Sequence, residues 1–153
     1  MDAVDDCKEG EMDRAHIEQR AAKALEFHDR NFNCAQSVAC SCCDLAGLDE
    51  ATAFRMMEGF GGGMGRFTET CGALSGVVAL VSFAQSEGPH NPTTKRNTYA
   101  IISQLVDAFE RENGSTLCGH LTGHVTGTKL QDCPKLIQDG VRLTAECLGA
   151  EEA

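Results

Sequence analysis

A run of glycines followed by a cysteine is the feature that most constrains this chain. Five of the seven residues from Gly59 to Gly65 are glycine, and Cys71 follows where a continuous apolar pattern begins. Glycine tolerates positive φ and lets other atoms approach the backbone closely, so this run predicts a turn with tight packing. The run lacks the Gly-Lys-Ser/Thr ending of a phosphate-binding loop and does not follow a strand pattern, so no nucleotide is expected. We therefore expect residues 59–76 to close around Cys71.

Hydrophobic periodicity predicts an all-α fold, a compact bundle of about six to seven helices. The expected helices cover residues 12–30, 34–46, 49–60, 71–85, 92–112, 116–121 and 133–148. Segment 71–85 is apolar on nearly every face, which is typical of a helix at the centre of a fold. Helical spacing places Leu25 and His28 on the buried side of the first helix and Phe60 on the buried side of the third.

Length and charge limit the classes of protein to which the chain can belong. A chain of 153 residues is long enough for one domain with a hydrophobic core, so we expect an acidic flexible lead at 1–11 and one helical domain at 12–153. The lead has no apolar run, so a signal peptide is excluded and a cytoplasmic location is expected. The net charge of −10 disfavours nucleic acid, and no apolar segment is long enough to span a membrane.

Four of the nine cysteines are expected at the starts of four different helices: Cys34, Cys71, Cys118 and Cys133. The residues before them are of the types that cap helices, namely Asn33, Thr70, Asp132 and, for Cys118, Ser115 or Thr116. A helix N-terminus offers unpaired N–H groups and a partial positive charge, which favour a thiolate. The pattern therefore predicts four thiols of lowered pKa at one site.

The other five cysteines are expected to have lesser roles. Cys40, Cys42 and Cys43 lie within one turn of a helix and point in different directions, so they cannot all bind one metal ion. Cys42 is expected in the core, while the other two share a face and are either packed or auxiliary thiols. Cys7 and Cys147 are expected to be bystanders.

Several short segments together resemble the C_GCAxxG_C_C family of bacterial and archaeal proteins described as redox-active. The matching segments are 33–36 (Asn-Cys-Ala-Gln), 59–65, 69–76 (Glu-Thr-Cys-Gly-Ala-Leu-Ser-Gly), 114–118 and 133–134. The resemblance implies four characteristic cysteines, which correspond here to the same four residues, Cys34, Cys71, Cys118 and Cys133. Related domains occur beside a split-Soret cytochrome module, but this chain has no C-x-x-C-H motif, so c-type haem is not expected.

Three functions remain open from the sequence. In the first, Cys34, Cys71, Cys118 and Cys133 bind an iron–sulfur cluster or zinc for electron transfer or redox sensing. Backbone N–H groups of four glycines would then tune the site: Gly61, Gly62, Gly63 and Gly65. In the second, Cys71 and Cys118 are the redox thiols of a metal-free thiol–disulfide oxidoreductase. In the third, the cysteines are structural and the chain is a helical interaction protein.

The sequence also suggests partners. A redox function calls for a redox partner protein, and the number of apolar helix stripes is compatible with a homodimer.

Overall fold

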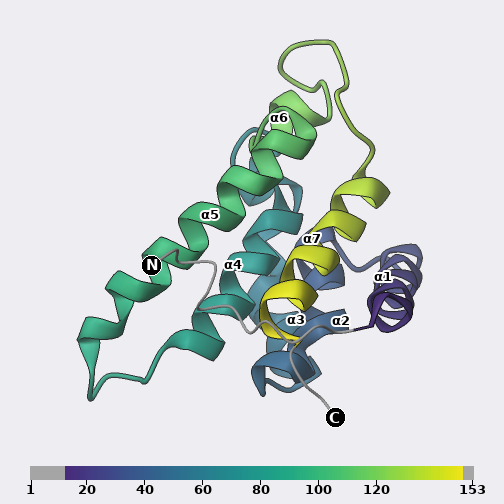
Figure 1. Cartoon of the computed structure of the whole chain (residues 1–153). Coiled ribbons are helices and arrows are strands. Elements are labelled where there is room, and N and C mark those ends of the chain that lie inside the picture. Colours follow the sequence, from purple (N-terminus) through teal and green to yellow (C-terminus); the bar gives the residue numbers. More distant parts are fainter. Residues whose placement is uncertain (1–12, 150–153) are drawn as a thin grey trace.

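The computed structural model describes residues 13–149, and all regular elements in that range are helices or helical turns (Figure 1). The helices are α1 (Arg14–Asp29), α2 (Cys34–Ala46), α3 (Glu50–Met57), α4 (Gly72–Gln85), α5 (Lys95–Asn113), α6 (Cys118–Leu121) and α7 (Cys133–Leu148). The short turns are η2 (Glu58–Phe60), η3 (Gly63–Phe67) and η4 (Pro92–Thr94). The predicted all-α bundle is confirmed, while the acidic lead at 1–11, with Cys7, falls outside the described residues. None of the described helices has the length and apolar character needed to cross a membrane.

Helix α2 begins and ends where local sequence signals place it. The Asn33 side chain accepts a hydrogen bond from the N–H of Gln36 at 2.8 Å, and the Gln36 side chain accepts one from the N–H of Asn33 at 2.9 Å. This reciprocal pair is a capping box, which satisfies two N–H groups that the helix itself leaves unpaired. Gly47 ends the helix with a left-handed φ of 78°.

Helix α2 is the most enclosed element of the described chain. Residues 35–43 are buried without interruption, because α2 packs against α1, α3, α4 and α7. Helix α4, which the sequence placed at the centre, lies against α2, α5 and α7 and is buried from Gly72 to Val77. Its second half exposes Phe83. The centre of the bundle is thus shared by two helices, and Figure 1 shows α4 beside α7 in the middle of the molecule.

The predictions of buried positions are partly wrong. On α1 the fully buried residues are Ala24 and Phe27, whereas the predicted Leu25 is partly buried but packs against the core, and the predicted His28 is partly buried. Phe60 is exposed because α3 ends at Met57 and the chain tightens into η2. The Glu58 carbonyl accepts a hydrogen bond from the Asn33 side chain at 2.9 Å, which ties this turn to the start of α2.

Two glycines allow α2 to approach both α4 and α7. A Cβ atom on Gly76 of α4 would lie 3.1 Å from the Cβ of Val38, and one on Gly140 of α7 would lie 3.0 Å from the Cγ2 of the same valine. Both would also meet backbone carbonyl oxygens, of Ala35 at 3.0 Å and of Ala73 at 3.1 Å respectively. Backbone atoms cannot move aside as side-chain ends can. The three helices therefore meet around Val38 only because these positions have no side chain.

This packing predicts that Gly76→Ala and Gly140→Ala destabilise the fold, although alanine favours a helix by about 1 kcal/mol over glycine. Overpacking of this kind costs about 1–3 kcal/mol, so we expect each variant to unfold at lower urea concentration with an unchanged dependence on urea. Gly59→Ala is the control, because no atom lies within 4 Å of its added Cβ. A stability of Gly140→Ala equal to or above that of the parent would contradict the packing account.

Candidate functional site

The four predicted cysteines lie at the beginnings of four helices. Cys34, Cys118 and Cys133 are the first residues of α2, α6 and α7, whereas Cys71 is the residue just before α4. These helices are far apart in the sequence, so the site is built by tertiary packing.

Only one of the predicted side-chain caps is present, that of Asn33. Thr70 does not cap α4, because Cys71 occupies the N-cap position and makes no side-chain cap bond. The N-cap of α6 is Leu117, whose N–H donates to the Ser115 hydroxyl at 3.0 Å. Asp132 precedes α7 without a capping bond, and its carboxylate instead accepts a 2.6 Å hydrogen bond from Lys129.

A single antiparallel bridge between Thr70 and Leu117 holds the segments before α4 and α6 together. The N–H of Cys71 donates to the carbonyl of Thr116 at 2.8 Å, and the N–H of Cys118 donates to the carbonyl of Glu69 at 2.7 Å. Each cysteine follows a bridged residue directly. Because side chains alternate along extended chains, Cys71 and Cys118 lie on the same side of this bridge.

Glycines bring the other segments close. A Cβ on Gly72 would lie 2.4 Å from the Sγ of Cys34, so this thiol rests directly on the first residue of α4. A Cβ on Gly63 would lie 2.4 Å from the Cβ of Cys118, so the glycine loop rests on the start of α6. These contacts explain why glycine occurs at both positions, since real Cβ atoms do not approach other atoms so closely.

The four thiols form one electrostatically connected cluster. Cys34 affects the ionisation of each of the other three. Cys118 also interacts with Cys71 and with Cys133. The structure therefore brings the four predicted residues into one neighbourhood, although their sequence positions give no local motif.

The prediction of lowered thiol pKa values is wrong for three of these cysteines. Burial, followed by repulsion from the Cys34 thiolate, raises the pKa of Cys71 to about 12. The same two causes, in the same order, raise the pKa of Cys118 and of Cys133. The backbone N–H groups of Ala73 and Leu74 at the start of α4 do lower the pKa of Cys71, as a helix start should, although Cys71 makes no capping hydrogen bond. This favourable contribution is smaller than the cost of removing a thiolate from water.

The arrangement of the donors bears on metal binding. Among the described residues, no group of three or more His, Cys, Asp or Glu side chains is placed so that it could hold a metal ion in the present conformation. All four cysteines of the cluster are free thiols. In chemical type, four thiols match the ligand set of a tetrahedral zinc or of an iron–sulfur cluster.

Three of the four glycines predicted to face a cofactor, Gly61, Gly62 and Gly63, have packing roles in the loop. A Cβ on Gly61 would collide with the Asn33 side chain at 2.2 Å, and one on Gly62 would lie 3.0 Å from the Phe67 ring. Gly63 contacts Cys118 as described above, while no atom lies within 4 Å of a Cβ on Gly65. Gly62, Gly63 and Gly65 all have positive φ. The loop thus closes on the thiol cluster, and its role toward a cofactor stays a prediction.

The remaining described cysteines lie away from this cluster. Cys42 is fully buried, as expected, and burial raises its pKa to about 12. Cys40 and Cys43 have C-x-x-C spacing, a sequence signal that can mark a redox motif or a metal site. The Cys43 thiol donates to the Cys40 carbonyl at 3.5 Å, and the Cys40 thiol donates to the Glu50 carbonyl at 3.7 Å. Both are buried, and burial raises both pKa values, so packing accounts for them.

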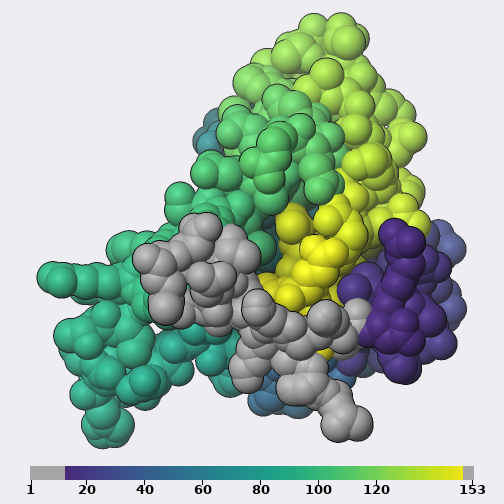
Figure 2. Space-filling view, viewed as in Figure 1, coloured from purple at the N-terminus to yellow at the C-terminus, as the bar shows by residue number. Residues whose placement is uncertain are grey.

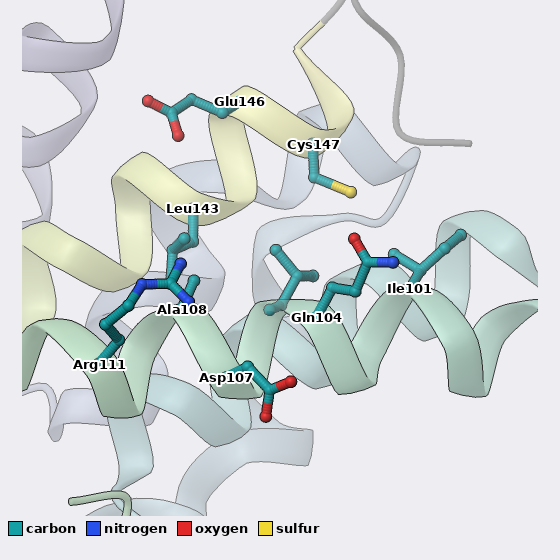
Figure 3. A pocket seen from close by; sticks show the side chains of 9 residues that line it. Ile101, Gln104, Asp107, Ala108, Arg111, Leu143, Glu146 and Cys147 are labelled. Carbon is teal, nitrogen blue, oxygen red and sulfur yellow. The ribbon is translucent and has the colours of Figure 1, made fainter. Parts of the chain in front are cut away.

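The pocket in Figure 3 does not coincide with the thiol cluster. It has a volume of about 330 Å³ and lies between α5 and α7. Its lining includes Ile101, Asp107, Ala108, Arg111, Leu143 and Glu146, together with Cys147. None of the four clustered cysteines lines it.

The chain matches a known protein family. The family model described as "Putative redox-active protein (C_GCAxxG_C_C)" matches residues 32–147, which include all four clustered cysteines. No curated protein and no solved structure matches the chain.

The contact between Gly72 and Cys34 predicts an energetic coupling between the two residues. Gly72→Ala should lower the free energy of unfolding by about 1–3 kcal/mol through overpacking. In a Cys34→Ala background, where Sγ is absent, the cost should fall by about 0.5 kcal/mol or more. Urea unfolding of the four proteins in this double-mutant cycle measures the coupling. Equal costs in the two backgrounds would show that Cys34 does not rest on α4.

The raised pKa of Cys71 predicts the pH dependence of its alkylation in metal-free protein. The thiolate fraction should still grow about tenfold per pH unit between about pH 9 and pH 10.5, where a free thiol has levelled off. Iodoacetamide rates at Cys71, followed by peptide mass spectrometry, test this expectation. A rate that levels off near pH 8.5 or lower would restore the helix-start prediction.

Proposed function

The chain belongs to the C_GCAxxG_C_C family, and from this premise we propose that it is a redox protein whose four clustered cysteines bind one metal ion or iron–sulfur cluster. The observation that carries the proposal is the electrostatic connection of Cys34, Cys71, Cys118 and Cys133 at four helix starts. These four thiols would be the ligands. A bound cluster would supply one-electron transfer, and a bound zinc would hold the four helix starts together.

The electrostatics of the cluster support a cation. The strongest electrostatic partners of Cys71 and Cys118 are other thiols, so ionising one makes ionising the next harder. A metal ion reverses this relation because a coordinated thiol is deprotonated outright. The buried backbone N–H groups that face Cys71 would then donate to a ligated sulfur, an arrangement that tunes the reduction potential of iron–sulfur sites.

The burial of Cys71 and Cys118 also favours metal binding over a metal-free thiol–disulfide oxidoreductase. Cys71 and Cys118 are only 4% and 8% exposed, whereas an attacking thiol must reach a substrate. A high pKa also leaves such a thiol protonated at neutral pH, which slows thiol–disulfide exchange.

A second candidate is a disulfide between Cys71 and Cys118, favoured by the bridge that places both on one side. The two thiols would lose two electrons and two protons to a disulfide substrate, which would leave as two thiols.

Anaerobic purification followed by iron, sulfide and zinc analysis tests the proposal. We expect a metal content that Cys→Ala substitution at any of the four clustered positions lowers at least about tenfold, because each position would supply one ligand. Cys43→Ala is the matched control, since Cys43 is also a buried cysteine but lies outside the cluster. Circular dichroism confirms that each variant is folded.

Two outcomes would count against metal binding. The first is a parent protein without metal after both anaerobic purification and reconstitution with iron, sulfide or zinc. The second is equal loss of metal in Cys43→Ala and in the cluster variants. Mass mapping of a Cys71–Cys118 disulfide in oxidised, metal-free protein would then support the second candidate.

A further inference from the structure

An apolar surface surrounds the segments that hold the thiol cluster. Four large apolar side chains are exposed there: Phe60 at 39%, Met64 at 40%, Phe67 at 55% and Val125 at 57%. We call these four residues the apolar rim. They come from η2, from η3 and from the segment after α6, which protrudes at the end of the molecule in Figure 2.

Contacts show that the rim is continuous. Turn η2 packs on η3, and η3 packs on α6. A Cβ on Gly119 of α6 would lie 2.5 Å from Val125 and 3.1 Å from the carbonyl oxygen of Phe67, so this glycine sits between the two rim residues. The ring of Phe67 also lies 5.9 Å from that of His124.

Backbone conformation turns two rim residues outward. Met64 and Phe67 have positive φ values of 63° and 65°. Such angles are unfavourable for residues other than glycine. The loop therefore exposes the apolar side chains of Met64 and Phe67 to solvent while their backbone is in an unfavourable conformation. Backbone strain of this kind is concentrated at functional sites.

Charges within the same patch indicate what covers it. Arg66 lies between the two strained residues, and Glu69 follows two residues after Phe67. Within residues 13–149, neither side chain takes part in an ion pair, and the Glu69 carboxylate accepts a hydrogen bond only from the neighbouring Thr68 at 2.8 Å. A patch with both charge signs is self-complementary, as a two-fold interface between identical chains requires.

We propose that the apolar rim is a two-fold interface with a second copy of this chain, in which Phe67 packs at the centre and Arg66 pairs with the partner's Glu69. The chain carries a net charge of −10, so two copies repel at long range and only a local contact of opposite charges can orient them. The interface would cover the segments that hold Cys71 and Cys118. It would place the thiol clusters of the two copies toward each other. The proposal does not depend on whether the cluster binds metal.

Sedimentation velocity of the full chain over a range of concentrations tests the interface. We expect a mass that rises from that of one 16.3 kDa chain toward twice this value. Phe67→Asp should weaken the association at least about tenfold, because it removes a central apolar contact and adds charge repulsion. Tyr99→Asp is the control, since Tyr99 is an exposed aromatic residue on α5 outside the rim.

Charge exchange tests the orientation. Arg66→Glu should weaken the dimer, and the double variant Arg66→Glu with Glu69→Arg should restore it, because the pair across the two-fold axis is re-formed with reversed sign. Folding is confirmed by circular dichroism for each variant. A chain that stays monomeric at all concentrations, a dimer unaffected by Phe67→Asp, or a double variant no better than Arg66→Glu would overturn the proposal.

Discussion

The close approach of α4 to α2 is the contact on which the rest of the structure depends. Gly72 and Gly76 are one helical turn apart on α4 and both face α2, where Gly72 meets the thiol of Cys34 and Gly76 meets Val38. Gly140 of α7 meets Val38 from another direction. Gly76, which lets α4 approach the core of α2, is therefore on the same face of α4 as Gly72, which contacts the thiol of the first cysteine. The same contact between α4 and α2 therefore packs the core and places the Cys34 thiol beside Cys71.

This arrangement sets two electrostatic effects against each other at the start of α4. The N–H groups at the start of α4 favour the thiolate of Cys71, while burial and the neighbouring Cys34 disfavour it more strongly. The glycines make this conflict sharper, because they exclude water by allowing contact distances that side chains would forbid. The fold thus gathers four thiols, and it raises the pKa of three of them, Cys71, Cys118 and Cys133, in metal-free protein. In such a place a cation changes the ionisation state far more than a change of pH within the physiological range.

The sequence predicts those parts of this structure whose signals are local. The bounds of α2 follow from Asn33, Gln36 and Gly47, and those of α7 follow from Pro134 and the apolar spacing, so both helices agree with the prediction. Where a long-range contact competes with a local signal, the predicted helix end is wrong. Thr70 is a good capping residue by type, but its bridge to Leu117 leaves Cys71 in the N-cap position instead. Helix α3 gives way to η2 at Glu58, whose carbonyl accepts a hydrogen bond from Asn33, a residue distant in sequence.

In the candidate site, too, properties set by local sequence could be predicted, whereas properties set by the assembled fold could not. Residues of capping type and the glycine run indicated the four cysteines that the fold brings into one neighbourhood, because both signals can be read within a few residues. The pKa values could not be read in this way, since they depend on how deeply the assembled fold buries each sulfur. A site assembled from four distant helix starts also has an energetic consequence. Any ligand that joins Cys34, Cys71, Cys118 and Cys133 crosslinks a span of 100 residues, from 34 to 133. A ligand that binds only this assembled geometry adds its binding free energy to the stability of the whole fold, so occupancy of the site and global unfolding must be linked.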